Sequence, residues 1–168
     1  MARRTVVNVN FPPLAADARA APDPSVVLEI VFADSDLVAV NKPGGMACIP
    51  LDPGERGTVA NALAARFPET AGAGDTPLEA GVLHRIDGGT SGVVLAARSQ
   101  AVFEAMRRQF RAHEVCKEYT ALVEGAVTAP GRLEHLLAHQ PSFRGRMVDA
   151  ARLARPDRAM AAVTDYRP

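Results

Sequence analysis

The segment His84 to Gly92, with the sequence HRIDGGTSG, carries the residues best suited to chemistry in this chain. Arg85 and Asp87 are two positions apart, so in an extended backbone the guanidinium and the carboxylate lie on the same side. Gly88 and Gly89 follow, and because glycine has no β-carbon the chain can turn sharply there and a ligand can approach closely. Read alone, an arginine and an aspartate before a glycine-rich hairpin are more often an ordinary surface feature than a catalytic site.

Apolar patterns on both sides predict how this segment is held. Residues 81–86 read as an incoming strand and residues 93–97 as an outgoing strand, which places Asp87 at a strand end. Alternation then turns Arg85 and Asp87 to one side of the incoming strand. The side chains expected on the other side, facing inward, are those of Val82, His84 and Ile86.

The rest of the chain predicts a mixture of strands and helices. The expected elements are strands over 26–32 and 37–41, an amphipathic helix over 58–67 capped by Gly57 or Thr58, a helix from its cap Ser99 to about His113, a strand over 117–125 and the beginning of a strand over 161–168. Residues 126–160 are expected to be mostly loop. In the long helix, the stripe expected to be buried is Phe103, Met106 and Phe110, beside a face with Arg107, Arg108 and Arg111.

Size and composition limit the classes to which the chain can belong. With 168 residues it is long enough for one buried core and too short for two comfortable ones. No apolar run approaches the ~18 to 20 residues of a membrane span, and the N-terminal segment is not a secretory signal, so we expect a soluble, cytoplasmic protein. Cys48 and Cys116 match neither a metal-ligand spacing nor a disulfide framework.

The charge is balanced overall but not locally. The 19 basic and 19 acidic residues give a net charge of zero, which argues against binding nucleic acid through bulk positive potential. The segment 98–111 nevertheless has Glu104 as its only acid, and its basic residues are Arg98, Arg107, Arg108 and Arg111. Arginine forms bidentate bonds to phosphate and stacks on bases, so this face suits RNA, and it suits a solvated helix face equally well.

Three separated motifs occur in one order: LVAVNKPGG at 37–45, HRIDGGTSGVVLAAR at 84–98 and KEYTALVEG at 117–125. Together they closely resemble the RluA family of RNA pseudouridine synthases, which carries an NKPxG loop, an HRLDxxTSG catalytic loop and a KxYxAxVxG strand at comparable intervals. The resemblance covers roughly residues 29–166. Three ordered motifs are far more specific than any one of them.

The resemblance implies both a fold and a reaction. The fold is expected to be α+β, with a mixed, largely antiparallel sheet and flanking helices over residues 26–168, after an N-terminal arm (1–25) with no separate RNA-binding domain. The implied activity is that of an isomerase that converts a specific uridine of ribosomal or transfer RNA to pseudouridine, without a cofactor or a metal. The expected partner is RNA, and the protein is expected to be a monomer.

The resemblance also assigns roles to individual residues. Asp87 matches the catalytic aspartate, a nucleophile that attacks either the sugar or the base. Tyr119 matches the tyrosine that lies against the target base and is proposed to help remove the proton from carbon 5. Arg85 matches the arginine that fills the space left by the flipped uridine. Arginines assigned to RNA binding are Arg107, Arg108 and Arg111. Residues expected to support the site are His84, Thr90, Ser91, Asn41 and Lys42.

The sequence differs from the family pattern in two places. Gly88 and Gly89 stand where the family usually has bulkier or charged residues. The family also continues into a GRTHQIR-like segment, whose arginine pairs with the catalytic aspartate, and we expect a catalytic domain that is incomplete at its C-terminus. Two interpretations stay open: an active enzyme, or an inactive RNA-binding remnant or fragment of one. A hydrolase that uses Asp87 ranks far behind, because no nearby carboxylate supports it.

Overall fold

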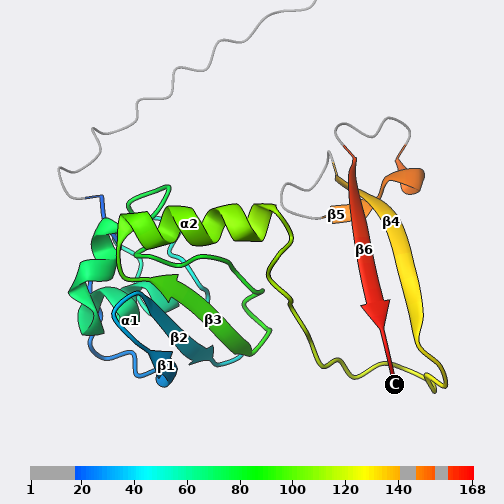
Figure 1. Cartoon of the computed structure of the whole chain (residues 1–168), viewed down its shortest axis with the longest axis horizontal. Helices are drawn as coiled ribbons and strands as arrows, with labels where there is room; N and C mark the ends of the chain where they lie inside the picture. The colour runs from blue at the N-terminus through cyan, green and yellow to red at the C-terminus, as the bar shows by residue number, and fades with distance from the viewer. Residues whose placement is uncertain (1–17, 141–146, 154–158) are drawn as a thin grey trace, which may run out of the picture. The chain divides into compact units, whose positions relative to one another are not determined.

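The computed structural model describes residues 18–140, 147–153 and 159–168. The chain divides into two compact units, Met1–Lys117 and Glu118–Pro168, each built around its own sheet (Figure 1). Most of the expected N-terminal arm, residues 1–17, lies outside the described residues. None of the described helices is long and apolar enough to cross a membrane.

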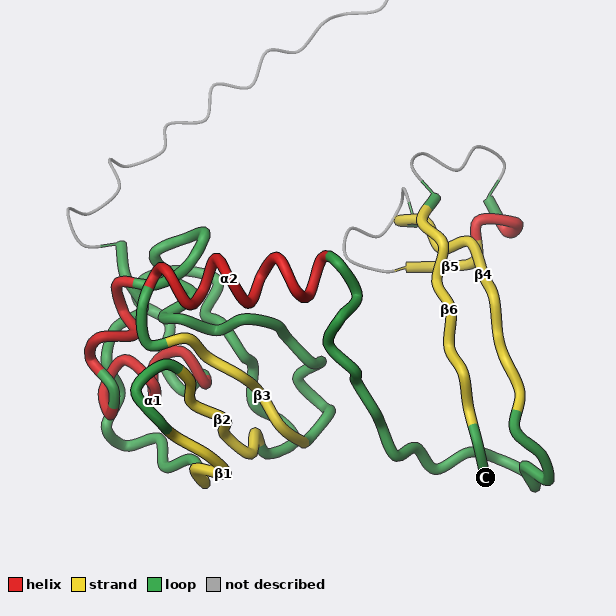
Figure 2. The backbone as a smooth tube through the Cα atoms, in the orientation of Figure 1, coloured by secondary structure: helices red, strands yellow, loops and turns green. Residues whose placement is uncertain are grey.

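The first unit contains a three-stranded antiparallel sheet in the order β1-β2-β3 (Figure 2). Its strands are β1 (Glu29–Ala33), β2 (Leu37–Lys42) and β3 (Gly92–Ala97). The turn between β1 and β2 is closed by Asp34, whose carboxylate accepts hydrogen bonds from the backbone nitrogens of Asp36 at 2.8 Å and Leu37 at 2.7 Å. The strands predicted over 26–32, 37–41 and 93–97 are confirmed, although β1 begins later than expected.

Two helices cover opposite faces of this sheet. They are α1 (Val59–Arg66) and α2 (Gln100–Arg111). Side chains alternate along a strand, so Val94 of β3 packs in one core with Leu63 of α1, whereas Ala97 packs in the other core with Phe103 of α2. Figure 1 shows α2 running along the sheet on one side. The segment 84–92 leads into β3, the strand whose two faces contribute to these cores.

Both helices begin at side-chain caps, as the sequence predicted. The backbone nitrogen of Asn61 donates to the Thr58 hydroxyl at 3.3 Å, and the Thr58 nitrogen donates to the Asn61 side-chain oxygen at 3.0 Å. The Ser99 hydroxyl accepts a hydrogen bond from the Val102 nitrogen at 3.4 Å. A short 3-10 helix, η1 (Pro68–Gly72), follows α1, and α2 ends at Arg111, slightly before the predicted end.

The described end of the expected N-terminal arm packs against the start of α1. Ala20 and Asp23 are buried. The Asp23 nitrogen donates to the carbonyl of Asn61 at 3.0 Å, and the Asp23 carboxylate accepts a hydrogen bond from the Gly57 nitrogen at 3.2 Å. These residues therefore belong to the core of the first unit.

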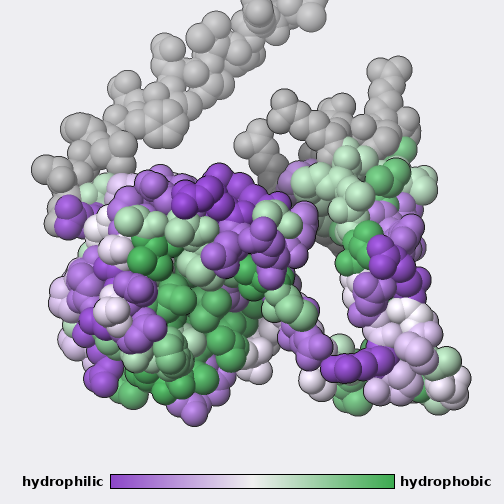
Figure 3. Space-filling model, in the orientation of Figure 1, coloured by the Kyte–Doolittle hydropathy of each residue, from purple (hydrophilic) through white to green (hydrophobic). Residues whose placement is uncertain are grey.

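The face of the sheet that carries α2 is only partly covered. Phe32 lies opposite Ala39, which lies opposite Leu95, so these three side chains share the face of the sheet on which α2 packs. On this face Phe32 is 52% exposed and Val93 is 51% exposed. Figure 3 shows hydrophobic side chains at the surface next to α2, over the strands. The apolar surface of the sheet thus continues beyond the helix.

The second unit contains a three-stranded antiparallel sheet in the order β5-β4-β6. Its elements are β4 (Gly131–His139), β5 (Met147–Asp149), a 3-10 helix η2 (Ala150–Arg152) and β6 (Met160–Tyr166). The strand predicted near residue 161 is confirmed. The expectation that residues 126–160 are mostly loop is wrong for β4, because most of its side chains are exposed and its apolar residues do not alternate.

Two predicted strands are not formed. Residues 81–86 make one isolated bridge, between Val82 and Ala96, and continue as an irregular extended segment. Residues 117–125 form no strand, since none of the described residues pairs with them in a ladder, and Tyr119 is 64% exposed. The predicted fold class is confirmed: the described chain is α+β, its strand pairings are antiparallel, and helices flank the sheet of the first unit.

Candidate active site

Arg85 and Asp87 project from the first unit as the alternation predicted. Both are exposed, whereas His84 and Ile86 are half-buried. Neither the Arg85 nor the Asp87 side chain forms a hydrogen bond or an ion pair with another residue that the structure describes. The guanidinium and the carboxylate are therefore available to a ligand, and the backbone that carries them is held from the inside.

The histidine ring explains why the predicted strand stops at His84. The Leu83 nitrogen donates to the Leu95 carbonyl at 2.9 Å, as in a ladder. The Leu95 nitrogen, however, donates to His84 Nε2 at 3.2 Å instead of to a backbone carbonyl. A side chain thus takes the place of the next ladder partner, and the backbone after His84 is released from the sheet.

His84 lies in an environment that favours its neutral form. Its ring is 5.3 Å from the ring of Phe110 on α2, measured between centroids. Burial, and secondly the positive charge of Lys117, lower the pKa of His84 from its usual value of 6.5. Because Nε2 accepts a bond, the neutral ring carries its proton on Nδ1, which is buried without a partner among the described residues.

The lowered pKa of His84 predicts a pH-dependent stability of the first unit. As the pH falls below about 6.5, the unfolded chain binds the proton before the folded chain does, so the free energy of unfolding decreases until the folded-state pKa is passed. Asp23 and Glu69, whose pKa values lie below 3.8 and 4.5, titrate at lower pH. Urea unfolding followed by circular dichroism reports on this unit, since it contains both of the α-helices that the structure describes.

The matched comparison uses two histidine variants. His84→Gln should remove most of the decrease between about pH 7 and 5, whereas His139→Gln, at an exposed position of β4, should retain it. An unchanged pH dependence in His84→Gln would contradict the assignment.

Two further contacts hold the segment 84–92 from the core that α1 covers. The Ile86 nitrogen lies 3.5 Å from Cys48 Sγ, and the Ile86 carbonyl lies 3.4 Å from the same sulfur. Cys48 is buried in the core that α1 covers, and Ile86 packs against that core. The thiol therefore fixes the residue between Arg85 and Asp87.

Lys42 joins the first motif to the second. Its side chain is fully buried, and Nζ donates to three carbonyls, those of Pro43 at 3.0 Å, Met46 at 2.7 Å and Gly88 at 3.2 Å. The Gly88 carbonyl also accepts a bond from the Gly45 nitrogen at 2.7 Å. The NKPGG loop and the loop after Asp87 are thus bound to each other directly.

The remaining supporting residues make smaller contributions. The turn after Asp87 is closed by its backbone, because the Thr90 nitrogen donates to the Asp87 carbonyl at 2.9 Å. The hydroxyls of Thr90 and Ser91 form no hydrogen bond with a described residue, so hydroxyl bonds to the backbone do not account for this turn. Asn41 is exposed and donates from Nδ2 to a Glu29 carboxylate oxygen at 2.8 Å, away from the Asp87 loop.

The arginines of the basic segment differ in their surroundings. Arg108 and Arg111 are exposed on α2. Arg98 binds Glu69 through Nε at 2.7 Å, and Arg107 is turned toward the segment that precedes His84. Tyr119 belongs to the second unit, so the structure does not place it relative to Asp87.

A metal centre and a deep apolar site are not found around Asp87. In the part of the chain that the structure describes, no cluster of His, Cys, Asp and Glu could hold a metal ion. An apolar groove of about 540 Å³ lies between α1 and the chain around β1, and its lining includes Val26, Leu28, Leu63 and Phe67. It contains no residue of the segment 84–92.

A model of the RNA pseudouridylate synthase family matches residues 36–162, a range that contains the Asp87 loop and its anchors. The chain belongs to this family. The resemblance drawn from the three motifs is thereby confirmed for the family.

Curated relatives in the pseudouridylate synthase family are named ribosomal large subunit pseudouridine synthase D. That of Yersinia pestis is 34% identical over 131 residues, which cover 78% of this chain and 39% of the relative. That of Zymomonas mobilis is 33% identical over 143 residues, covering 84% and 44%. The chain therefore spans less than half the length of these curated relatives.

Solved structures of pseudouridylate synthases share the fold. Human RNA pseudouridylate synthase domain containing 4 is 26% identical, with a TM-score of 0.58 over 83% of this chain and 52% of that chain. Human RNA pseudouridylate synthase domain containing 1 is 24% identical, with a TM-score of 0.61 over 83% and 51%, and supports the fold alone.

Sequence reasoning missed two residues around the Asp87 loop. The sequence indicates only that Cys48 matches neither a metal-ligand spacing nor a disulfide framework, and nothing in its neighbourhood indicates a contact with Ile86. Asp75 binds Arg107 from a loop rich in glycine and proline, where an acid is usually solvated. Both contacts join residues far apart in the chain, which a local pattern does not reveal.

Proposed function

We propose that this chain carries the catalytic aspartate of an RNA pseudouridine synthase and converts a uridine of large-subunit ribosomal RNA to pseudouridine. The single observation that carries the proposal is the Asp87 loop: an exposed carboxylate on a backbone held at Leu83, His84, Ile86 and Gly88. The names of the curated relatives favour ribosomal over transfer RNA. Such an enzyme would act in the cytoplasm, and we expect a monomer.

The proposed reaction needs a positioned nucleophile and no cofactor. An Asp87 carboxylate oxygen attacks the sugar or the base, the bond between uracil N1 and ribose C1′ is broken, and the uracil turns. C5 then bonds to C1′, the C5 proton leaves, N1 gains a proton, and the carboxylate is released. A carboxylate that forms and releases a covalent intermediate divides one difficult step into two easier ones.

The other roles follow from side-chain chemistry and exposure. Arg85 is exposed next to Asp87, and a planar guanidinium can stack in the space that a flipped base leaves. Flipping costs a few kcal/mol, of which such stacking offsets a part. Arg108 and Arg111 are exposed on α2 and suit contacts with RNA phosphates. Tyr119 is proposed to lie against the target base, where its hydroxyl assists removal of the C5 proton.

The proposal is tested with RNA that carries tritium at C5 of uridine. The 168-residue chain, in excess over RNA, is incubated with large-subunit ribosomal RNA and separately with transfer RNA, both transcribed in vitro, and release of tritium to water is measured. We expect release from the ribosomal transcript. RNA binding without release from either transcript would overturn the proposal and support an inactive RNA-binding protein.

A further inference from the structure

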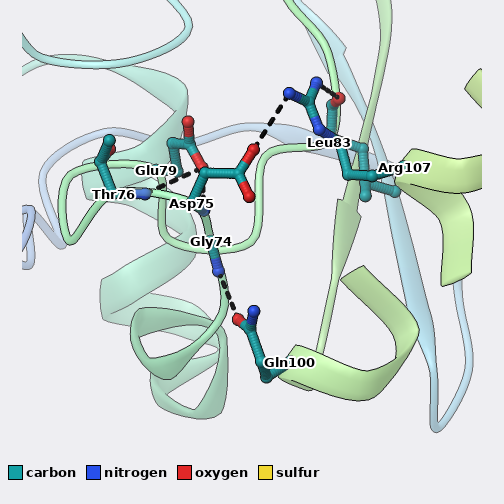
Figure 4. Close-up of polar contacts among 7 residues, drawn as sticks. All are labelled: Gly74, Asp75, Thr76, Glu79, Leu83, Gln100 and Arg107. Atoms are coloured by element: carbon teal, nitrogen blue, oxygen red, sulfur yellow. Dashed lines mark hydrogen bonds and ion pairs between the residues drawn. The ribbon is translucent and has the colours of Figure 1, made fainter. Parts of the chain in front are cut away.

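Arg107 reaches from α2 to the backbone immediately before the HRID motif. Its Nη1 donates to the Leu83 carbonyl at 3.3 Å, and its Nη2 binds an Asp75 carboxylate oxygen at 3.1 Å (Figure 4). The Leu83 carbonyl is the last peptide oxygen before His84. The two ends of the guanidinium therefore join a loop, a helix and the start of the catalytic segment.

The loop that supplies Asp75 is itself fixed. The Gly74 nitrogen donates to the side-chain oxygen of Gln100 at 2.9 Å, at the start of α2. The Asp75 nitrogen donates to a Glu79 carboxylate oxygen at 2.6 Å, and Figure 4 shows Gln100 and Glu79 beside the loop that carries Asp75. Asp75 therefore presents a held acceptor to Arg107 rather than a mobile surface charge.

Three of the five N–H donors of the Arg107 guanidinium are engaged or buried. Its Nε is buried with no partner among the described residues, and its central carbon lies 5.8 Å from the centre of the Phe103 ring. The Arg107 side chain is 35% exposed and belongs to the half-buried residues, whereas Arg108 and Arg111 are exposed. A contact of an RNA phosphate with Arg107 would compete with the bonds to Asp75 and Leu83 for the same two terminal nitrogens.

The helix contacts the catalytic segment at two consecutive residues. Arg107 binds Leu83, and Phe110, one helical turn later, packs its ring on His84. His84 in turn accepts the hydrogen bond from Leu95 that ends the strand pairing. Helix α2 thus fixes the point at which the backbone leaves the sheet, three residues before Asp87.

We infer that Arg107, oriented by Asp75, is a positioning residue of the Asp87 loop and not an RNA-binding residue. This inference rests on the proposed function. A small displacement of a reacting group lowers the rate of the chemical step, by up to about 100-fold for 1 Å, without weakening substrate binding. A residue that contacts phosphate instead changes affinity and its dependence on salt.

The test compares Arg107→Gln with Arg66→Gln, an exposed control on α1 with the same change of charge. With tritiated ribosomal RNA and saturating protein, we expect Arg107→Gln to lower the single-turnover rate by about 10- to 100-fold and Arg66→Gln to leave it unchanged. The dissociation constant for RNA should stay within about twofold of the wild-type value. The slope of the logarithm of the binding constant against the logarithm of the salt concentration should be unchanged. A slope reduced by about one, with a normal rate at saturation, would overturn the inference.

Two conservative variants separate positioning from charge and from stability. Asp75→Asn should lower the single-turnover rate. Its effect should not add fully to that of Arg107→Gln, because both substitutions break the same ion pair. Arg107→Lys keeps the charge but cannot donate to both partners as the guanidinium fork does, so an intermediate rate is expected. A wild-type rate in Arg107→Lys, or in Arg107→Gln below its unfolding temperature, would overturn the inference.

Amide hydrogen exchange tests the role of Arg107 without requiring that the chain be an active enzyme. If the wild-type chain converts no uridine, the proposed function fails, but the Leu95 amide still reports on the segment because it donates to His84. We expect its exchange to be about tenfold faster in Arg107→Gln and unchanged in Arg66→Gln. Equal exchange in both variants would overturn the role of Arg107.

Discussion

Asp87→Asn is expected to abolish tritium release from ribosomal RNA while RNA affinity stays within about twofold. Asparagine has the shape of aspartate, but its amide is far too weak a nucleophile to form the covalent intermediate. The Asp87 side chain has no hydrogen bond or ion pair with a described residue, so the substitution removes no contact that stabilises the fold. We therefore expect Asp87→Asn to lose the reaction while its RNA affinity and its free energy of unfolding stay close to the wild-type values.

The control for Asp87→Asn is Asp36→Asn, which removes one negative charge from an exposed position in the turn between β1 and β2. It should release tritium at the wild-type rate. Turnover retained by Asp87→Asn would exclude Asp87 as the nucleophile. Loss of RNA binding in the same variant would indicate that its carboxylate serves the interface and not the chemistry.

Lys42→Met is expected to destabilise the first unit by about 2 to 3 kcal/mol, because it removes the donor to three carbonyls from a fully buried position. Methionine retains most of the apolar stem, so the loss is mainly polar. The Gly88 carbonyl keeps its bond from Gly45, whereas the carbonyls of Pro43 and Met46 lose the ammonium. Urea unfolding followed by circular dichroism measures the effect.

The comparison for Lys42 uses Lys42→Arg and Arg66→Met. The guanidinium is larger than the ammonium and does not fit a site with no exposed surface, so Lys42→Arg should also destabilise, although it keeps the charge. Arg66→Met, at an exposed position, should change the free energy of unfolding by less than about 0.5 kcal/mol. A stability of Lys42→Met equal to that of Arg66→Met would show that the bonds to the two loops contribute nothing.

Local signals in the sequence were sufficient for the helices and for most of the first sheet. Thr58 and Ser99 are N-caps because a hydroxyl satisfies a backbone donor that the helix leaves open, and this depends only on nearby residues. Arg85 and Asp87 are exposed as alternation predicted. The family resemblance, and with it the candidate nucleophile, also came from motifs that are short and contiguous.

What the sequence could not show depends on distant partners. The segment 81–86 has the alternation of a strand, but the His84 ring takes the bond from Leu95 and ends the pairing. Residues 117–125 alternate as well, yet a strand exists only where another strand pairs with it. The ion pair between Arg107 and Asp75 could not be predicted either, because an arginine or an aspartate alone does not indicate which distant residue it contacts.

The extended segment after Gly81 also affects how this protein avoids unwanted association. A strand at the edge of a sheet exposes a row of backbone groups on which another chain can add, the first step of many aggregates. Along β3, Val82 and Leu83 pair with Ala96 and Leu95, and the His84 ring occupies the next donor. A histidine and a short backbone stretch thus close much of this edge to strand addition, and the same contacts hold the backbone that leads to Asp87.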